Sequence, residues 1–258
     1  MIPDSLNKAQ LARALDPLSN DFQIYALDSC DSTNAVARRL ALEGTEKAII
    51  VSNHQTAGRG RMGRQFHSPA DVGIYLSILY PIEGDLSESL SITCATSVSV
   101  MRAIRSKTNL QTEIKWVNDL LLDEKKVCGI LCEAITLGQK NWLIVGIGIN
   151  LRPSVFPKEL TEIAGSLNQN TLPRVDLIAE IVKELLPYLN DPQDNGWLEE
   201  YRRYSCVLGK EILRIENGIS VPCHAESIDD RGRLTVRHAN GALEFLQSGE
   251  ISVRTTKI

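Results

Sequence analysis

The sequence predicts an α+β protein, in which a sheet flanked by helices is followed by a small β-barrel. Up to residue 207 helical patterns alternate with short β-branched runs. Beyond Leu208 the pattern changes to short alternating strands, separated by turn signals at a spacing of roughly ten residues, as in a small barrel. A chain of 258 residues can bury one large core and a smaller one, so we expect a domain boundary near residue 207.

The first elements alternate between helices and strands. We expect an amphipathic helix over 5–15, strands over 23–27, 48–52 and 73–80, and helices over 35–42 and 86–105. The cluster Asp31-Ser-Thr-Asn34 is typical of a helix N-cap. Leu90, Cys94, Val98 and Met101 follow helical spacing, so the last of these helices should pack on the sheet.

The later elements begin with several strand-like pieces over 112–150, which end in the apolar run 142–150. Helices are expected over 175–189 and 196–204, with Pro173 near the first start. Asn217-Gly218, Asp230-Arg-Gly232 and Asn240-Gly241 are the hairpin signals of the small barrel. We therefore divide the chain into an N-terminal helical extension (1–22), a main domain (23–207) and a small C-terminal domain (208–258).

Composition and charge exclude several classes of protein. The net charge is -4 and the pI about 5.7, so no global basic field favours nucleic acid. Six cysteines without any C-x-x-C pair indicate reduced thiols of a cytoplasmic protein. We find no signal peptide and no apolar run of membrane length, and we expect no membrane partner. The histidines lack ligand spacing, so no metal-binding residue is assigned.

The segment Gly58 to Arg64 is the most distinctive motif, with three arginines and three glycines in seven positions. Glycines let a backbone approach a ligand, and guanidinium groups match phosphate or carboxylate oxygens. The segment also matches G-x-G-x-x-G, but it joins a strand to a strand, whereas a dinucleotide loop must open a helix. No Walker motif occurs. The acidic body favours a small anionic ligand over two alternatives, a solubilising surface turn and an RNA-binding arginine-glycine patch.

Four polar clusters lie where predicted strands end or helices begin, which is where a central sheet places ligand-binding groups. They are Asp31-Ser-Thr-Asn34, Gln55 with the segment Gly58 to Arg64 (the arginine loop), Lys115-Trp-Val-Asn-Asp119, and Lys126 before Val127-Cys-Gly129. Taken singly, each has a simpler interpretation as a cap, a turn or a solvated charge. Taken together, the four clusters form an ordered pattern along the chain.

The ordered series closely resembles the biotin-protein ligase family. It also includes Tyr75-Leu-Ser77 and Gly146-Ile-Gly-Ile-Asn150, and the resemblance runs from about residue 23 to the C-terminus. It implies a mixed central sheet related to class II aminoacyl-tRNA synthetases and to lipoate ligases. Ser248-Gly-Glu-Ile-Ser252 resembles the end of that family's SH3-like barrel.

The resemblance implies a ligase that activates biotin with ATP and Mg²⁺ to biotinoyl-5'-AMP. The acyl group then passes to one lysine of a biotin carboxyl carrier protein, the expected partner. No enzyme nucleophile is needed, because the site has only to hold two anions together and stabilise charge at phosphorus. Arginine and lysine are suited to that task.

Individual roles also follow from the resemblance. Ser32, Thr33 and Gln55 match positions that bind the neutral biotin head, and Lys126 matches the lysine facing the biotin carboxylate and α-phosphate. The biotin and adenylate set is Ser32, Thr33, Asn34, Gln55, Gly58, Arg59, Gly60, Arg61, Tyr75, Lys126 and Gly129. The nucleotide set is Arg61, Arg64, Phe66, Asn118, Asn150 and Arg254, and the catalytic set is Lys126, Arg61 and Asp119. Asn118 and Asp119 are expected to orient Mg²⁺, phosphate or the incoming lysine.

The chain departs from the family pattern at Met62, Val117 and Phe66, where a basic residue, a proline and a tryptophan are common. About twenty residues precede the catalytic domain, too few for the winged helix-turn-helix of repressor members, so no DNA partner is expected. A lipoate or octanoate ligase is the enzymatic alternative, although Gln55 with the arginine loop favours biotin. A homodimer remains open, since family members differ in oligomeric state.

Overall fold

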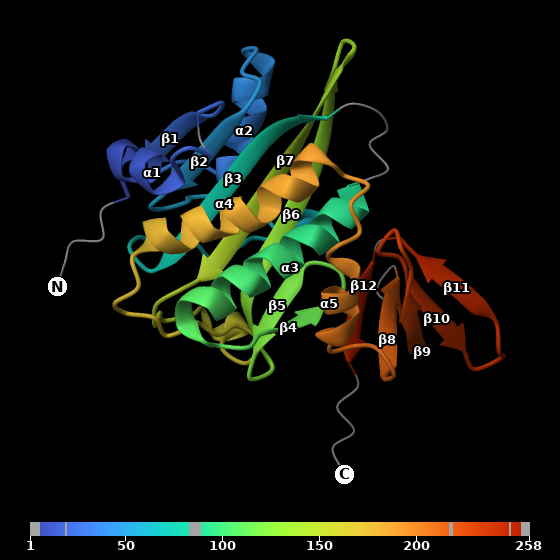
Figure 1. Ribbon diagram of the computed structural model, residues 1–258. Helices are drawn as coiled ribbons and strands as arrows, with labels where there is room; N and C mark the ends of the chain where they lie inside the picture. The colour runs from blue at the N-terminus through green and yellow to red at the C-terminus, as the bar shows by residue number, and fades with distance from the viewer. Residues whose placement is uncertain (1–5, 19, 83–88, 217–218, 248, 254–258) are drawn as a thin grey trace.

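Two β-sheets organise the chain (Figure 1) in the computed structural model, which describes residues 6–18, 20–82, 89–216, 219–247 and 249–253. The large sheet has seven strands in the order β1-β2-β3-β7-β6-β5-β4. Its strands are β1 (Gln23–Leu27), β2 (Ala48–Ser52), β3 (Gly73–Ile82), β4 (Glu113–Lys115), β5 (Asp119–Leu122), β6 (Lys125–Leu137) and β7 (Lys140–Asn150). β1 pairs with β2 in parallel and the other neighbours are antiparallel, so the predicted mixed sheet is confirmed.

The small sheet has five antiparallel strands in the order β11-β10-β9-β8-β12. They are β8 (Glu211–Glu216), β9 (Ile219–Ile228), β10 (Leu234–His238), β11 (Leu243–Leu246) and β12 (Glu250–Val253). The predicted C-terminal all-β unit is therefore confirmed. Among the strands that the structure describes, no pairing joins β11 to β12, so hydrogen bonds do not close the sheet into a barrel.

Helices cover both faces of the large sheet. They are α1 (Lys8–Leu15), α2 (Thr33–Leu42), α3 (Ser89–Thr108), α4 (Arg174–Asn190) and α5 (Leu198–Arg203). Figure 1 shows α3 and α4 crossing the near face, and they share with α1 the larger apolar core. α2 packs with a smaller cluster on the other face. None of the described helices is long and apolar enough to cross a membrane.

The strand registers explain the two cores. Ile49, Ile78 and Val145 are partners across β2, β3 and β7, and all three join the core under α3 and α4. One residue further along, the row of Ala48, Leu79 and Ile144 faces α2, because successive side chains alternate between faces. α2 covers only this part of its face. The rest of the face is left for other segments, and the cavity described below lies there.

Most expected elements form close to their predicted limits. α1 begins at Lys8, where the Asn7 side chain accepts a hydrogen bond from the Gln10 amide at 2.9 Å, and Ser5 lies outside the described residues. α3 is described from Ser89, so its expected first turn is outside them too. The strand-like stretch 112–150 forms the four strands β4 to β7. The turn Asn217-Gly218 also lies outside the described residues.

The small sheet is attached to the end of the large one through a buried hydrogen bond. Trp116 Nε1 donates to the carbonyl oxygen of Gly232, between β9 and β10, at 2.9 Å. The Tyr201 hydroxyl of α5 donates to the neighbouring Val117 carbonyl at 3.0 Å. Gly232 has a φ of +81° and fits tightly, since a Cβ there would lie 2.7 Å from Cys94 Sγ. The Lys115-Trp-Val-Asn-Asp119 motif is thus held by the small sheet and by α5.

Candidate functional site

A cavity of about 500 Å³ lies on the α2 face of the large sheet. It is enclosed by the start of α2, the arginine loop, the β4–β5 turn, the segment after β7 and the edge of the small sheet. These elements are far apart in sequence. The cavity nevertheless brings together most residues that the sequence nominates: Ser32, Thr33, Asn34, Gln55, Arg59, Gly60, Arg61, Arg64, Phe66, Asn118, Asp119, Lys126, Gly129 and Asn150.

Glycines form the floor of the cavity. Gly129 and Gly148 are partners across β6 and β7, and Gly146 lies two residues along β7 on the same face. A Cβ on Gly146 would lie 2.2 Å from Asn34 Oδ1, and one on Gly148 would lie 2.6 Å from the Phe66 ring. The absence of side chains therefore lets Asn34 and Phe66 lie directly on the sheet. Sequence analysis gave Gly146 and Gly148 no role, although their alternation with isoleucines was a visible signal.

One end of the cavity is lined by the neutral polar groups of Thr33 and Gln55. Gln55 Oε1 accepts from the Thr33 amide at 2.8 Å and lies 3.2 Å from Thr33 Oγ1. Gln55 Nε2 donates to Ser68 Oγ at 2.8 Å, and Ser68 in turn donates to the Phe66 carbonyl at 2.9 Å. These bonds hold Gln55 in one orientation beside the start of α2. Such an end suits an uncharged ligand group with donors and acceptors of its own.

The start of α2 is fixed by an ion pair on its outer side. Arg39 binds Asp31 with both terminal nitrogens, each at 2.9 Å, and the Ser32 amide donates to Asp31 at 2.8 Å. The hydrogen bonds from Arg39 are the largest cause that lowers the pKa of Asp31, to about 2. Asp31 therefore stays ionised and orients Ser32.

The arginine loop is folded as a narrow hairpin. The Gly60 amide donates to the Arg64 carbonyl at 2.7 Å, and the Phe66 amide donates to the Gly58 carbonyl at 2.9 Å. Its tip is a single 3-10 turn, Arg61–Gly63, in which Met62 has a φ of 55° and a side chain that is 74% exposed. The predicted strand-loop-strand arrangement is confirmed. The loop is connected to the cavity through its arginines and Phe66.

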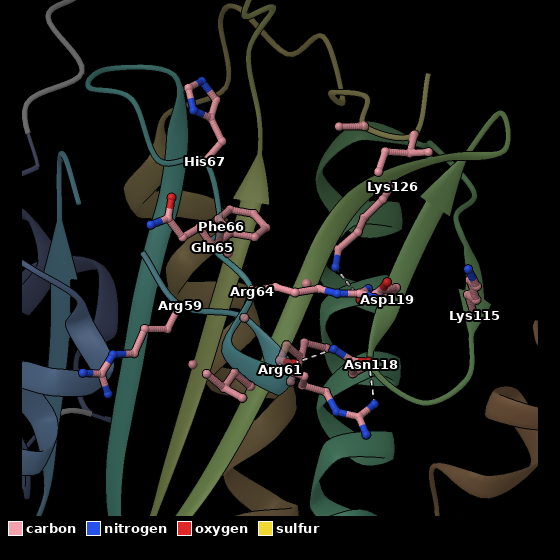
Figure 2. Close-up of a pocket in the computed structure, with 18 of the residues that line it drawn as sticks. Arg59, Arg61, Arg64, Gln65, Phe66, His67, Lys115, Asn118, Asp119 and Lys126 are labelled. Atoms are coloured by element: carbon pink, nitrogen blue, oxygen red, sulfur yellow. Dashed lines mark hydrogen bonds and ion pairs between the residues drawn. The ribbon is translucent and has the colours of Figure 1, made fainter. Parts of the chain in front are cut away.

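Arg61 joins the loop to the β4–β5 turn. Its Nη1 donates to Asn118 Oδ1 at 3.1 Å, and Asn118 Nδ2 donates to the Ile130 carbonyl at 2.8 Å (Figure 2). Burial lowers the pKa of the Arg61 guanidinium, which still remains charged. Figure 2 shows that Arg59 extends away from this group, on the other side of the loop. Arg61 is thus the arginine that closes the loop on the sheet.

Lys126 and Asp119 form an ion pair inside the cavity, with Nζ 2.6 Å from Oδ1. Lys126 lies above Gly129, where a Cβ would come within 3.0 Å of its Nζ. In Figure 2 the side chains of Lys126 and Arg64 both extend toward Asp119, whereas those of His67 and Lys115 point elsewhere. Cationic groups therefore converge at the end of the cavity opposite the neutral one, which fits a carboxylate or a phosphate.

The segment after β7 supplies an apolar wall that sequence analysis did not find. Asn150 Nδ2 donates to the Gly165 carbonyl at 2.9 Å, and the Lys126 amide donates to the Ile163 carbonyl at 2.8 Å, so the segment is held along β6. The residues of this wall are Phe156, Leu160, Ile163 and Ala164. Together with the Phe66 ring they suit a flat apolar ligand group. Ile215, Gly249 and Ile251 of the small sheet also line the cavity.

Two nominated residues, Tyr75 and Gly58, do not line it. Tyr75 is buried, its hydroxyl donates to the Pro69 carbonyl at 2.7 Å, and its ring centroid lies 6.5 Å from that of Phe66. Gly58 packs against the Phe66 carbonyl, 2.4 Å from where its Cβ would be. Both therefore support Phe66 instead of facing the cavity. Arg254 lies outside the described residues.

Comparison with known proteins identifies the family. Residues 27–150 match the model of the biotin/lipoate A/B protein ligase family. The chain is 36% identical to the bifunctional ligase/repressor BirA of Bacillus subtilis, over 97% of this chain and 80% of that relative. It is 31% identical to the biotin-[acetyl-CoA-carboxylase] ligase of Paracoccus denitrificans, over 82% of this chain and 92% of that relative.

Solved structures agree with these relatives. A biotin protein ligase from Aquifex aeolicus in complex with biotin and ATP matches with a TM-score of 0.73 and 27% identity, over 90% of this chain and 98% of that one. The named ligases act on biotin, so the lipoate alternative is not supported. The chain therefore belongs to the biotin/lipoate A/B protein ligase family, as a biotin-protein ligase.

Proposed function

We propose that this biotin-protein ligase uses its cavity to join biotin to ATP as biotinoyl-5'-AMP, and then transfers biotin to one lysine of a biotin carboxyl carrier protein. One observation carries the proposal. Lys126 and Arg61 enter a cavity whose other end, at Thr33 and Gln55, offers neutral hydrogen-bonding groups. Biotin has the same polarity, with an uncharged urea ring at one end and a carboxylate at the other.

In the first step a biotin carboxylate oxygen attacks the α-phosphorus of ATP, and pyrophosphate leaves. Both reactants are anions, so the barrier includes their repulsion and the charge that develops at phosphorus. Lys126 can bridge the carboxylate and the α-phosphate if it exchanges its contact with Asp119 for the ligand. Arg61 and Arg64 add positive charge from the loop, and Arg59 and Gly60 complete the segment that covers the adenylate.

The nucleotide base would lie between Phe66 and the apolar wall after β7, with Asn150 fixing that wall. Phe66 offers one aromatic face, and its position on Gly148 keeps that face low over the sheet. We retain Arg254 as a nucleotide-side residue by resemblance alone.

Magnesium would enter with ATP. The hard oxygens of Asp119 and Asn118 beside Lys126 are suited to Mg²⁺, which usually takes one or two protein carboxylates and completes its shell with phosphates and water. Asp119 Oδ1 is buried beside Lys126 Nζ, and it would be free to bind such an ion once Lys126 turns to the ligand. When bound, Mg²⁺ neutralises phosphate charge, and Asp119 and Asn118 would hold it near the α-phosphate.

In the second step the neutral amine of the acceptor lysine attacks the acyl carbon of the adenylate, a C–N bond forms and AMP leaves. A mixed anhydride hydrolyses if water reaches it, so the loop must stay closed until the acceptor arrives. The bond between Arg61 and Asn118 supports this lid role. We also propose that residues 23–207 form the catalytic unit, that residues 208–258 form the SH3-like unit beside it, and that the protein works in the cytoplasm.

A single assay tests the proposal. The protein is incubated with ATP, Mg²⁺, labelled biotin and a biotin carboxyl carrier domain, and label on the carrier is measured. We expect label only with ATP present, and none on a carrier whose acceptor lysine is replaced by arginine. Labelled lipoate in place of biotin is the control. Transfer of lipoate but not biotin, or no transfer at all, would refute the proposal.

A further inference from the structure

Ser77 on β3 lies behind the neutral end of the cavity, 0% exposed and not among the lining residues. Its hydroxyl oxygen lies 2.7 Å from Thr33 Oγ1 and 2.6 Å from Asn34 Oδ1. Ser77 is the strand partner of Gly146, the floor glycine on which Asn34 lies. It therefore contacts two residues of the cavity without reaching the cavity itself.

Asn34 presents only an acceptor to Ser77. Its Nδ2 donates to the Leu131 carbonyl at 3.2 Å and to Glu133 Oε2 at 2.8 Å. A carbonyl and a carboxylate can only accept, so these bonds fix which end of the amide is nitrogen. The Oδ1 atom must then face Ser77. Arg38 pairs with Glu133 at 3.4 Å and supports the carboxylate in that role.

Gln55 presents only an acceptor to Thr33. Its Oε1 already accepts a hydrogen bond from the Thr33 backbone N–H, which can only donate. Its Nε2 donates to Ser68, whose own proton is committed to the Phe66 carbonyl. The Thr33 hydroxyl thus lies between the Gln55 oxygen at 3.2 Å and the Ser77 hydroxyl at 2.7 Å.

The two shortest oxygen pairs each hold a proton when Thr33 donates to Ser77 and Ser77 donates to Asn34. The opposite direction, with Ser77 donating to Thr33, would leave the Ser77 and Asn34 oxygens 2.6 Å apart with no proton between them. The proton of Thr33 therefore points to a protein atom. Toward the cavity, Thr33 Oγ1 therefore offers lone pairs alone.

We propose that Ser77 is a specificity-determining positioning residue, which keeps the Thr33 hydroxyl an acceptor and so selects a ligand with an N–H donor at that point. This inference rests on the proposed function, in which the ligand group is the urea of biotin. Without Ser77, the acceptor that remains beside the Thr33 hydroxyl is Gln55 Oε1 at 3.2 Å, which is already engaged. The Thr33 hydroxyl can then turn toward the cavity and donate a hydrogen bond to a ring oxygen, at the position where the wild-type protein requires an N–H group.

The test compares biotin with its two cyclic carbamate analogues, in which one or the other ring N–H is replaced by oxygen. The quantity measured is the ratio of kcat/KM for biotin to that for each carbamate, in adenylate formation. We expect Ser77→Ala to lower the ratio for one carbamate about tenfold, the size of one mismatched buried hydrogen bond. Ser77→Cys, which keeps the volume with a weaker donor and acceptor, should lower it in the same direction.

Thr33→Val separates the effect on Thr33 from a loosening of the sheet. In that background Ser77→Ala should leave the ratio unchanged, because no hydroxyl remains to be oriented. Ser97→Ala is the matched control, since Ser97 is also fully buried and donates to the Thr93 carbonyl at 3.0 Å inside α3. It should lower stability without moving the ratio.

The inference and the proposed function fail in different ways. If the wild type does not label the carrier with biotin, the function is wrong. If the wild type labels it and Ser77→Ala and Ser77→Cys keep the wild-type ratio for both carbamates, the role of Ser77 is wrong. A fall of the ratio that is equally large in the wild-type and the Thr33→Val backgrounds would also overturn it.

Discussion

The ring of Phe66 lies on the backbone of Gly148, so closely that a Cβ there would come within 2.6 Å of Phe66 Cε1. Phe66 follows the arginine loop, and Gly148 lies in the middle of the large sheet. The contact therefore fixes how deep the cavity is where loop and sheet meet. Even a methyl group at position 148 would therefore clash with the Phe66 ring.

Gly148→Ala should displace the Phe66 ring and raise the KM for ATP about tenfold, while the protein stays folded. The reason is that overpacking forces the ring, rather than the paired strand, to move. Steady-state kinetics of adenylate formation and thermal unfolding measure the two effects. Ile149→Val on the opposite face of β7 is the control, with about 1 kcal/mol lost in stability and an unchanged KM. A normal KM in Gly148→Ala would contradict the proposed place of the base.

Lys126→Ala should lower the rate of adenylate formation about a hundred- to a thousandfold, the usual effect of removing one preorganised charge contact. Exchange of labelled pyrophosphate into ATP measures this step alone. Lys125→Ala is a matched control, because that neighbouring lysine donates to the Thr161 carbonyl instead of entering the cavity. It should retain nearly full activity. Comparable losses in both variants would remove Lys126 from the reaction centre.

Arg61→Gly should still form the adenylate but release it, so that bystander proteins become biotinylated on lysines. The variant loses the Arg61–Asn118 bond that holds the loop to the β4–β5 turn. Adenylate retained after rapid gel filtration, and label on added serum albumin, are the measurements. Asn118→Ala should have a weaker effect in the same direction. Because both changes remove the same contact, the double variant should release little more adenylate than Arg61→Gly alone.

Trp116→Phe should destabilise the protein by about 1–3 kcal/mol more than Trp142→Phe. Both changes remove the same ring atoms from buried sites, but only the first leaves a carbonyl, that of Gly232, without its donor. Trp142 Nε1 is buried and has no hydrogen-bond partner within the described residues. Urea unfolding followed by circular dichroism gives the two free energies. Equal losses would show that the indole bond contributes little to the attachment of the small sheet.

Arg39→Gln should change stability in a pH-dependent way. The pKa of Asp31 in the folded protein is lowered from 3.8 to about 2, so the pair stabilises the fold above pH 4 and the contribution is lost as pH falls toward 2. Both side chains are about half exposed, so the wild-type advantage at neutral pH should be about 1 kcal/mol or less. Urea unfolding at several pH values tests this. An advantage that grows on acidification would have the wrong sign.

Much of the fold could be predicted because its signals are local. The β-branched and aromatic runs over 48–52 and 73–80, helical spacing at Leu90 and Cys94, and paired turn residues each act over a few positions. The polar clusters were also found, because each sits at the end of such an element. Their convergence on one cavity needed the strand order, which brings β3, β7 and β6 side by side.

The remainder depends on register and on packing between distant segments. The glycine floor exists only because Gly129 pairs with Gly148, and no local pattern reports a partner on another strand. The apolar wall around Phe156 and Ile163 has no periodicity to detect. Tyr75 and Gly58 show a further limit, since motif membership does not distinguish a residue that faces the cavity from one that supports it.

Ile215, Gly249 and Ile251 come from the small sheet and yet line the same cavity as Ser32 and Thr33. On the ribosome, the strands of the large sheet emerge first and can pair before β12 has been synthesised. A nascent chain can therefore have a finished floor while one wall is still missing. The competence to bind its ligand then arises late in synthesis, after most of the architecture is already in place.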